Sequence, residues 1–296
     1  DFGDEDSSGV LFIDPSTLNS HIHKYISGCF EPDSVVCGTS PVILEKSVKT
    51  PSEIEGMRQT YIDDGVAMER FLHWLETEVA SGREVDEWEA SERLTAFRSE
   101  IPGYRGNSFE NISAYGPGAA LPHYSTPREG SAIIRPRGLY LVDSGGQYLT
   151  GTTDITRTVP MGECTDLEKE DYTLVLKGMI DLSMAVFPRG TAGCQLDALA
   201  RMPLWRARRN FGHGTGHGVG IEIHEEPRLS PKTDKILCEG DIVTVEPGLY
   251  LFGKYGCRIE DMVLVTNGSD EVLNFAFMAF CDETHPVVFA DITYGF

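Results

Sequence analysis

The sequence contains no uninterrupted apolar run of about 18 residues, the length that a helix needs to cross a bilayer. It also lacks an excess of basic residues, because 25 Lys and Arg stand against 46 Asp and Glu, for a formal net charge of −21. These absences argue against a membrane span and against nucleic acid or an anionic membrane as the main partner. The acidic composition instead supplies many oxygen ligands for cations.

The N-terminal stretch DFGDEDSSGV has no basic segment followed by an apolar run, so we do not expect it to be a secretory signal. An initiating Met is also missing, so the chain looks like a fragment or a processed piece of a longer protein. The seven cysteines are odd in number and lack C-x-x-C pairs. This pattern predicts reduced, mostly buried thiols and a cytoplasmic location.

The chain is long enough to bury a core, and its pattern predicts two helices and three strands, followed by the same order again. In the first half, Ser52 and Glu55 form a capping box, and a second helix starts near Asp86. Thr165 and Glu168 form a corresponding box in the second half. The expected helices of that half are 165–186 and 195–208. The expected strands are 108–114, 138–144 and 152–159 in the first half, and 218–223, 241–246 and 257–265 in the second.

This repetition predicts an α+β fold with two pseudo-symmetric helix-helix-strand halves around a shared sheet. We expect residues 51–270 to form this domain. Residues 1–50 are interpreted as the remnant of a preceding domain or a linker, and residues 271–296 as a C-terminal extension.

Carboxylates stand at the ends of, or inside, four of the apolar strand segments: Asp143, Asp154, Glu246 and Glu260. Burying a lone charge there would cost several kcal/mol. Arg157 and Arg258 are close in sequence, but two bases cannot neutralise four acids. Two divalent ions would balance the four charges, and carboxylate-rich sites with few nitrogens suit pairs of Mn²⁺, Co²⁺ or Zn²⁺ ions. Such an arrangement is suited to hydrolysis.

The segment FGHGTGHGVGIEIHEEP places His213 and His217 four residues apart, as in helical zinc motifs that bind one metal through two histidines. Its glycines exclude a helix, since each costs about 1 kcal/mol relative to alanine. The segment is therefore a tight loop or a strand, in which glycines let the backbone and a substrate approach closely. In such a segment the two histidines lie too far apart for us to expect one metal to bind both.

Five segments together resemble the pita-bread metallopeptidases, and within them the Xaa-Pro aminopeptidase (aminopeptidase P) subgroup. These segments are DSGGQYLTGTTDITRT, GHGTGHGVG, IHEEP, VEPGLY and RIED. The resemblance covers about residues 50–266 and implies the pita-bread fold, with a curved and mainly antiparallel sheet.

The resemblance also implies a role for each matching residue. Asp143 would bind one metal, and His217 and Glu246 the other. Asp154 and Glu260 would bridge both metals. His123, His213 and His224 would surround the scissile bond as catalytic residues that bind no metal. Arg258, together with Tyr250, would hold a metal-binding carboxylate.

The implied cofactors are two divalent ions, with Mn²⁺ expected and Co²⁺ or Zn²⁺ as alternatives. The ions would activate a water that attacks the first peptide bond of a substrate with proline second. His224 would stabilise the oxyanion, and Glu246 would act as general base. The proline preference rests on the resemblance alone. The expected partners are proline-containing peptides, and a homodimer is compatible with the family.

Alternatives remain open. A prolidase of the same fold would cleave only Xaa-Pro dipeptides, and a non-catalytic module would bind peptides or histones. The five filled metal positions disfavour the non-catalytic module. Three features depart from the family pattern. The HEEP sequence introduces Glu226 where a glycine is usual, and most of the N-terminal domains of long aminopeptidases P are lacking. The C-terminal stretch from Leu273 does not resemble the family's usual tail.

Overall fold

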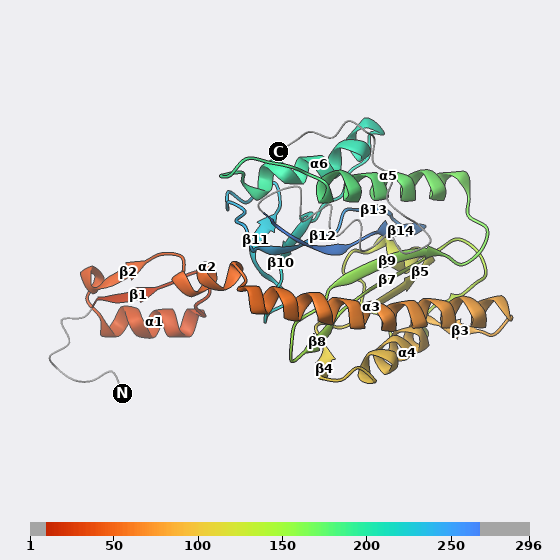
Figure 1. Ribbon diagram of the computed structural model, residues 1–296, viewed down its shortest axis with the longest axis horizontal. Helices are drawn as coiled ribbons and strands as arrows, with labels where there is room; N and C mark the ends of the chain where they lie inside the picture. Colours follow the sequence, from red (N-terminus) through yellow and green to blue (C-terminus); the bar gives the residue numbers. More distant parts are fainter. Residues whose placement is uncertain (1–9, 267–296) are drawn as a thin grey trace, which may run out of the picture. The chain divides into compact units, whose positions relative to one another are not determined.

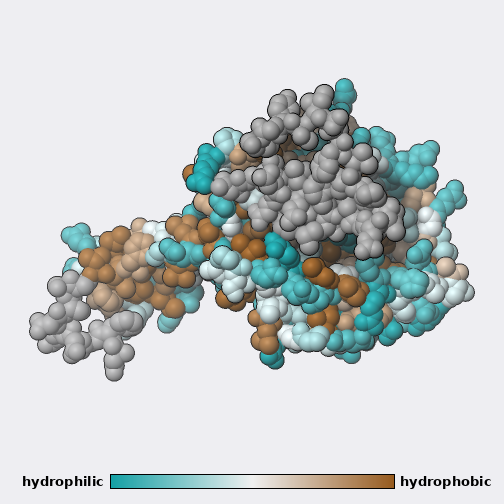
Figure 2. All heavy atoms as spheres, viewed as in Figure 1, coloured by the Kyte–Doolittle hydropathy of each residue, from teal (hydrophilic) through white to brown (hydrophobic). Residues whose placement is uncertain are grey.

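The computed structural model describes residues 10–266, which divide into two compact units between Ser47 and Val48. The first unit contains two parallel strands and two helices. Its elements are β1 (Leu11–Ile13), α1 (Ser20–Cys29), the 3₁₀ turn η1 (Pro32–Ser34), β2 (Val35–Cys37) and α2 (Pro41–Ser47). Apolar side chains such as Phe12 and Tyr25 remain exposed on this unit, where Figure 2 shows apolar residues gathered. A two-stranded sheet of this kind is marginally stable by itself.

The first half of the second unit starts with a long helix and continues into short strands. Its elements are α3 (Pro51–Ala80), β3 (Val85–Asp86), α4 (Glu87–Ser99), β4 (Tyr104–Asn107), β5 (Ile112–Tyr115), the 3₁₀ turn η2 (Gly116–Ala120), β6 (Ile133–Ile134), β7 (Leu139–Ser144), β8 (Gly146–Tyr148) and β9 (Ile155–Pro160). The central sheet of this half is antiparallel, in the order β5-β7-β9.

The second half repeats this order of helices and strands. Its elements are α5 (Asp166–Ser183), α6 (Gly193–Arg206), β10 (Gly216–Gly218), β11 (Glu225–Leu229), β12 (Ile242–Val245), β13 (Gly248–Leu251), β14 (Tyr255–Arg258) and β15 (Asp261–Leu264). Its antiparallel sheet has the order β11-β10-β12-β15. An antiparallel bridge between Thr156 and Glu260 joins the strands of the two halves. Figure 1 shows the strands β5, β7, β9, β10 and β12 between α3 and the pair α5/α6. The predicted α+β class and the repeated order are confirmed.

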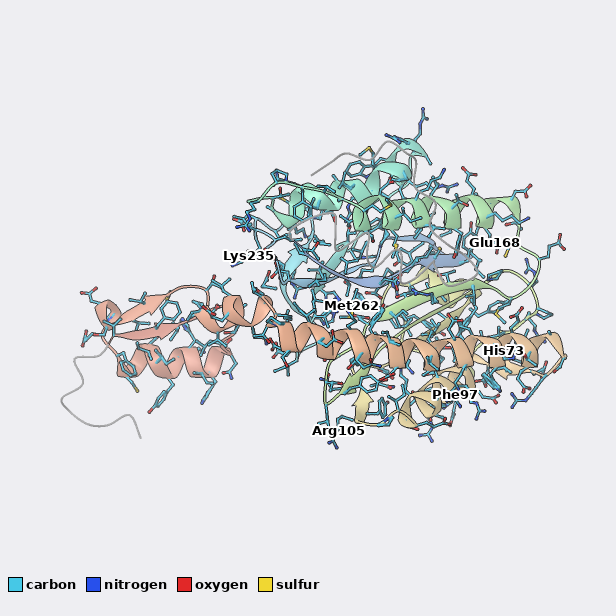
Figure 3. All side chains as sticks on the ribbon, viewed as in Figure 1. His73, Phe97, Arg105, Glu168, Lys235 and Met262 are labelled. Atoms are coloured by element: carbon cyan, nitrogen blue, oxygen red, sulfur yellow. The ribbon has the colours of Figure 1, made fainter. Side chains whose placement is uncertain are left out.

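Local sequence accounts for the starts of the two longest helices. The predicted box of Thr165 and Glu168 is present at the start of α5, where Glu168 is labelled in Figure 3. The box predicted for α3 was wrong by two residues, because Thr50 and Glu53 form it. Proline is favourable in the first turn, where its missing N–H is not needed, so Pro51 fits this earlier start.

Two apolar cores attach the helix pairs to the strands. In the first core, Phe71 of α3 and Leu94 of α4 are fully buried with Tyr140 of β7. In the second core, Leu204 of α6 packs in one cluster with Leu249 of β13. Each such side chain contributes about 1.5–3 kcal/mol on burial. These apolar side chains occupy the helix-facing sides of the strands. The polar residues of the site stand at the strand ends.

Three predicted strands differ from the structure. The strand predicted over 108–114 is present only from Ile112, where β5 begins. The other two are interrupted. β10 ends at Gly218, and the chain bends over residues 220–223 instead of continuing as a strand to 223. The predicted strand 257–265 is two strands, β14 and β15, interrupted at Ile259 and Glu260. Both interruptions occur beside polar side chains that turn into the site.

The cysteines and the helices test two further expectations. Of the six described cysteines, all are free thiols but only Cys257 is buried, so the prediction of mostly buried thiols was wrong. Among residues 10–266, no helix combines the length and apolarity that a bilayer crossing requires. The predicted C-terminal extension lies outside the described residues.

Candidate active site

The four strand-end carboxylates converge on one cavity of about 470 Å³. Asp143 lies near the end of β7 and Asp154 just before β9, while Glu246 directly follows β12 and Glu260 stands between β14 and β15. The antiparallel registers bring them together, since Asp143 lies opposite Thr156 and Thr156 bridges to Glu260. Segments more than 100 residues apart in sequence thus present their acids to the same space.

His217 of β10 faces these carboxylates. Its Nε2 lies 3.4 Å from Asp154 Oδ2 and 3.5 Å from Glu246 Oε1. Its Nδ1 lies 3.1 Å from the carbonyl oxygen of Gly218, which favours a proton on Nδ1 and leaves the lone pair of Nε2 directed at the acids. Ligand atoms of Asp154, His217 and Glu260 all lie within 4.8 Å of one another.

The charge of the cluster is not compensated by the protein alone. Burial raises the pKa of Asp154 well above its ordinary value, and the charges of Asp143 and Glu246 raise it further. Burial raises the pKa of Glu260 as well, and the charges of Asp154, Glu246 and Asp143 add to the rise. Burial also raises the pKa of Glu246, although the charges of His217 and Arg258 oppose the rise. Crowded, buried acids of this kind are the environment that a cation would stabilise.

One oxygen atom supports this conclusion. Asp143 Oδ1 is buried and has no hydrogen-bond partner among the described residues. Buried polar atoms are nearly always paired, so a lone carboxylate oxygen in this cavity fits a missing cationic partner. A donor set of carboxylates and one imidazole nitrogen suits divalent transition metals. The residues present therefore fit a metal centre.

Two of the acids accept hydrogen bonds from threonine hydroxyl groups. Thr156 Oγ1 donates to Glu260 Oε2 at 2.7 Å, and Thr244 Oγ1 donates to Glu246 Oε1 at 3.2 Å. Each hydrogen bond favours the ionised carboxylate and fixes one of its oxygens.

A chain of hydrogen bonds runs from Asp143 to His213. Arg258 donates to Asp143 Oδ2 at 2.6 Å and to the Tyr250 hydroxyl at 2.8 Å. Burial alone would lower the pKa of Arg258, but the charges of Tyr250, Asp143 and Glu246 outweigh burial and raise it. Because Tyr250 accepts from Arg258, its own proton is free for His213 Nε2, 2.8 Å away. Burial raises the pKa of Tyr250 to about 12, so the hydroxyl keeps this proton.

The three remaining candidate histidines have different surroundings. His213 has both ring nitrogens engaged, with Gly214 O at 2.7 Å and with Tyr250. The His224 ring meets the His217 ring edge to face at a centroid distance of 4.3 Å. His123 and His224 both line the cavity and are both exposed residues. Burial lowers the pKa of both His213 and His224 to about 4, so both rings are neutral near pH 7.

Comparison with known proteins identifies the family. Residues 55–267 match the model of metallopeptidase family M24. The chain belongs to this family. It is 45% identical over 240 residues to the probable Xaa-Pro aminopeptidase P of Tuber melanosporum, covering 79% of this chain and 39% of that protein. It is 39% identical over 306 residues to aminopeptidase P1 of Lotus japonicus, covering 95% of this chain and 46% of that protein.

Solved M24 structures show the same fold. The X-prolyl aminopeptidase of Caenorhabditis elegans, described as a cytosolic enzyme with a di-nuclear active site, matches with a TM-score of 0.80 and 38% identity over 85% of this chain and 41% of that one. The Xaa-Pro dipeptidase of Bacillus anthracis matches with a TM-score of 0.76 and 32% identity over 87% of this chain and 70% of that one. The pita-bread fold is thereby confirmed. The chain spans less than half the length of the two curated relatives and of the Caenorhabditis elegans enzyme.

The glycine-rich segment of this M24 chain packs tightly against the neighbouring strands. A Cβ on Gly216 would lie 1.8 Å from Thr244 O, and one on Gly218 would lie 2.2 Å from Glu226 O. Only glycine permits this approach of β10 to its neighbours. The glycines therefore bring His217 close to the carboxylates.

Sequence reasoning missed several residues around the M24 site. Arg201 of α6 donates to the carbonyls of Phe211 and His213 while it pairs with Asp197, so it fixes the loop before β10. Its only sequence signal was an ionisable pair four residues apart on an otherwise apolar helix. Arg228 of β11 lines the cavity, and it follows the HEEP departure directly.

Glu226 lies beside the cavity without lining it. Its Oε1 is 3.9 Å from Arg228 Nε, and its Oε2 is buried without a hydrogen-bond partner among the described residues.

Proposed function

We propose that this chain is the catalytic part of a metalloaminopeptidase that hydrolyses the first peptide bond of substrates with proline in second position. The observation that carries the proposal is the convergence of four carboxylates and one histidine on a single cavity. The names of the Tuber melanosporum and Caenorhabditis elegans proteins support the Xaa-Pro specificity. Because the Caenorhabditis elegans enzyme is described as cytosolic, we also propose a cytoplasmic location for this chain.

Two divalent metal ions are the proposed cofactors, with Mn²⁺ as the first choice and Co²⁺ and Zn²⁺ as alternatives. Asp143 would hold one ion, His217 and Glu246 the other, and Asp154 and Glu260 both. When bound, such a pair supplies the Lewis acidity that lowers the pKa of water and polarises a carbonyl. The domain limits proposed for this activity are residues 51–270.

The chain's own residues would divide the remaining tasks. Glu246 stands at the cavity with one oxygen fixed by Thr244, so its other oxygen can accept the proton of the attacking water and return it to the leaving nitrogen. His224 is neutral and lines the cavity, so its ring N–H can donate to the developing oxyanion. His123, on the exposed side, is placed to contact the substrate.

Arg258 and His213 would act through their partners. Arg258 orients Asp143 through its 2.6 Å hydrogen bond. Because both nitrogens of the His213 ring are engaged, we propose that His213 orients Tyr250 in addition to forming the cavity wall. Phe109 and Pro122 supply apolar surface for a proline ring in the same cavity.

A second candidate is a prolidase, and Arg228 favours it. This half-exposed guanidinium on the cavity wall could pair with the free carboxylate that a dipeptide, unlike a longer peptide, places near the scissile bond. Solved prolidases and Xaa-Pro dipeptidases also share the fold.

Paired substrates separate the two candidates. The full chain, loaded with Mn²⁺, is assayed with an Xaa-Pro-Pro tripeptide and an Xaa-Pro dipeptide, while metal content is measured by elemental analysis. Cleavage of the first bond of the tripeptide is the expected result. Cleavage of dipeptides alone would replace the aminopeptidase with the prolidase. Peptide binding by a metal-free chain without turnover would point to the non-catalytic module.

A further inference from the structure

A buried ion pair connects the segment before α3 with the active-site region. Lys49 Nζ lies 3.0 Å from Glu225 Oε2, and the side chains are only 4% and 3% exposed. The two residues are 176 positions apart. Lys49 directly precedes the N-cap of α3, whereas Glu225 begins β11 and directly follows His224. The pair therefore joins the start of the catalytic unit to a residue that neighbours the site.

Stability alone does not explain such a pair. The cost of removing two charges from water often equals or exceeds their attraction, and apolar replacements are frequently as stable. A buried ion pair does, however, define a geometry, because each partner must meet the other at hydrogen-bond distance. The pair is therefore better explained by the groups that it positions.

The carboxylate of Glu225 organises the bend that carries His224. Its Oε1 accepts a hydrogen bond from Glu222 N at 3.1 Å. A Cβ on Gly220 would lie 2.3 Å from Oε2, so a larger residue there would displace the carboxylate from its present position. The bend from Gly220 to Glu225 is thus built around a charged group, and Lys49 supplies the opposite charge.

The backbone of the Lys49 segment is itself held in place. Lys49 N donates to Gly240 O at 2.9 Å, and Val48 forms an antiparallel bridge with Asp241, just before β12. The ammonium group is therefore presented from a segment attached to the strand that leads to Glu246. A movement of the bend relative to β12 would break the ion pair.

We propose that Lys49 and Glu225 are positioning residues that hold the His224 ring in the cavity wall. His224 leads directly into Glu225, and its ring meets that of His217 edge to face at 4.3 Å. Neither Lys49 nor Glu225 lines the cavity. The inference rests on the role proposed for His224. In this view Lys49, at the start of the catalytic unit, helps to align the His224 ring.

The test combines ring spectroscopy with kinetics on the full chain. The variants are Lys49→Met, Glu225→Gln and the conservative Lys49→Arg. The control is Leu94→Ala, which opens a cavity in the core between α3 and α4 without contacting the site. Histidine ring signals are recorded for the metal-free proteins, and the His224 signal is assigned from its loss in His224→Gln. All kinetics are measured at a temperature at which every variant is folded.

We expect Lys49→Met and Glu225→Gln to shift the His224 ring signal, because the ring would leave its edge-to-face contact with His217. The kcat should fall about 10- to 100-fold, the range for residues that orient an active-site group, with KM little changed. Lys49→Arg should restore both readouts, and Leu94→Ala should change neither.

An unshifted His224 signal in Lys49→Met and Glu225→Gln would overturn the inference, as would kcat values equal to that of Leu94→Ala. If the wild-type chain binds metal but cleaves neither peptide, the proposed function fails. The ring signals of the metal-free protein then still decide whether the ion pair positions His224.

Discussion

Replacing Asp154 with Asn is predicted to stabilise the metal-free protein and to destabilise the metal-loaded one. Asp154 is 4% exposed and lies among three other carboxylates in the cavity. Without a cation these groups repel one another, and an amide of the same shape removes one charge. With metal bound, the same substitution removes the charge that two ions are proposed to share.

The structure sets the size of the effect. The ligand oxygens of Asp154 and Glu260 lie within 4.8 Å of each other. Two unit charges at that separation repel by about 3.5 kcal/mol at an effective dielectric constant of about 20. Protonation of the cluster relieves part of this repulsion, as the raised pKa values of both acids indicate. We therefore expect Asp154→Asn to raise the free energy of unfolding of the metal-free protein by about 1–3 kcal/mol. Each kcal/mol corresponds to about 2–4 °C in Tm.

The effect has a defined pH dependence. The folded-state pKa of Asp154 is raised, so above the unfolded value of about 3.9 the folded protein binds more protons than the unfolded protein. The contribution of Asp154 to the stability of the metal-free wild type therefore falls as the pH rises from about 4 toward the folded pKa. The advantage of Asp154→Asn should be small near pH 4 and larger at neutral pH.

The assay is thermal unfolding in EDTA and in excess Mn²⁺ at several pH values. The order of Tm values should reverse between the two conditions at neutral pH. Asp64→Asn is the matched control, because Asp64 is equally buried but accepts two hydrogen bonds from Arg98. Its loss leaves a buried cation unpaired and should cost about 3–5 kcal/mol in either condition. Two results would refute the dinuclear assignment. One is a lower Tm of Asp154→Asn than of the wild type in EDTA. The other is a rise in Tm on adding Mn²⁺ that is as large in Asp154→Asn as in the wild type.

Three further substitutions test separate parts of the site. His224→Ala should lower kcat about 10²- to 10³-fold with little change in KM, because it removes the proposed oxyanion donor; equal losses in kcat and affinity for substrate would contradict that role. Arg201→Lys should lower the free energy of unfolding by about 3 kcal/mol in urea titrations, since lysine cannot reproduce the bonds to Asp197, Phe211 and His213; an unchanged midpoint would contradict the loop anchor. Arg228→Met should raise KM for an Xaa-Pro dipeptide but not for a tripeptide, and parallel changes for both peptides would exclude a carboxylate contact.

The order of elements could be predicted because it depends on local signals. The Thr165 capping box, the apolar spacing of α3 and the apolar strands before Asp143 and Glu246 are all short-range patterns, and the structure contains each of them. The four acids were recognisable because charged residues at the ends of buried strands require a partner. The internal repeat predicted a sheet shared by the two halves, and the charge of the four acids predicted that they share a pair of divalent ions.

The polar residues behind the site could not be predicted in the same way. β11 was missed because the sequence EEPRL is mainly polar. Glu225 is buried in an ion pair with Lys49, which lies 176 positions away. The strand predicted to continue to Ile223 bends instead, because the chain at Gly220 turns around that carboxylate. Such long-range pairs leave no periodic pattern in the sequence, so local patterns predict that their members are exposed.

The charge of the site also differs from the value that the sequence suggested. Four carboxylates and two divalent ions would cancel, but Arg258 is buried against Asp143 and belongs to the same charge cluster. Four carboxylates (−4) and one guanidinium (+1) give −3, so two divalent ions would leave the centre with one net positive charge. His213 and His224 do not add to it, because burial keeps both rings neutral near pH 7. A net positive centre favours the negative charge that develops on the carbonyl oxygen during amide hydrolysis, whereas a neutral one would not. Arg258 thus contributes to the proposed catalysis through the charge that it adds as well as through the orientation of Asp143.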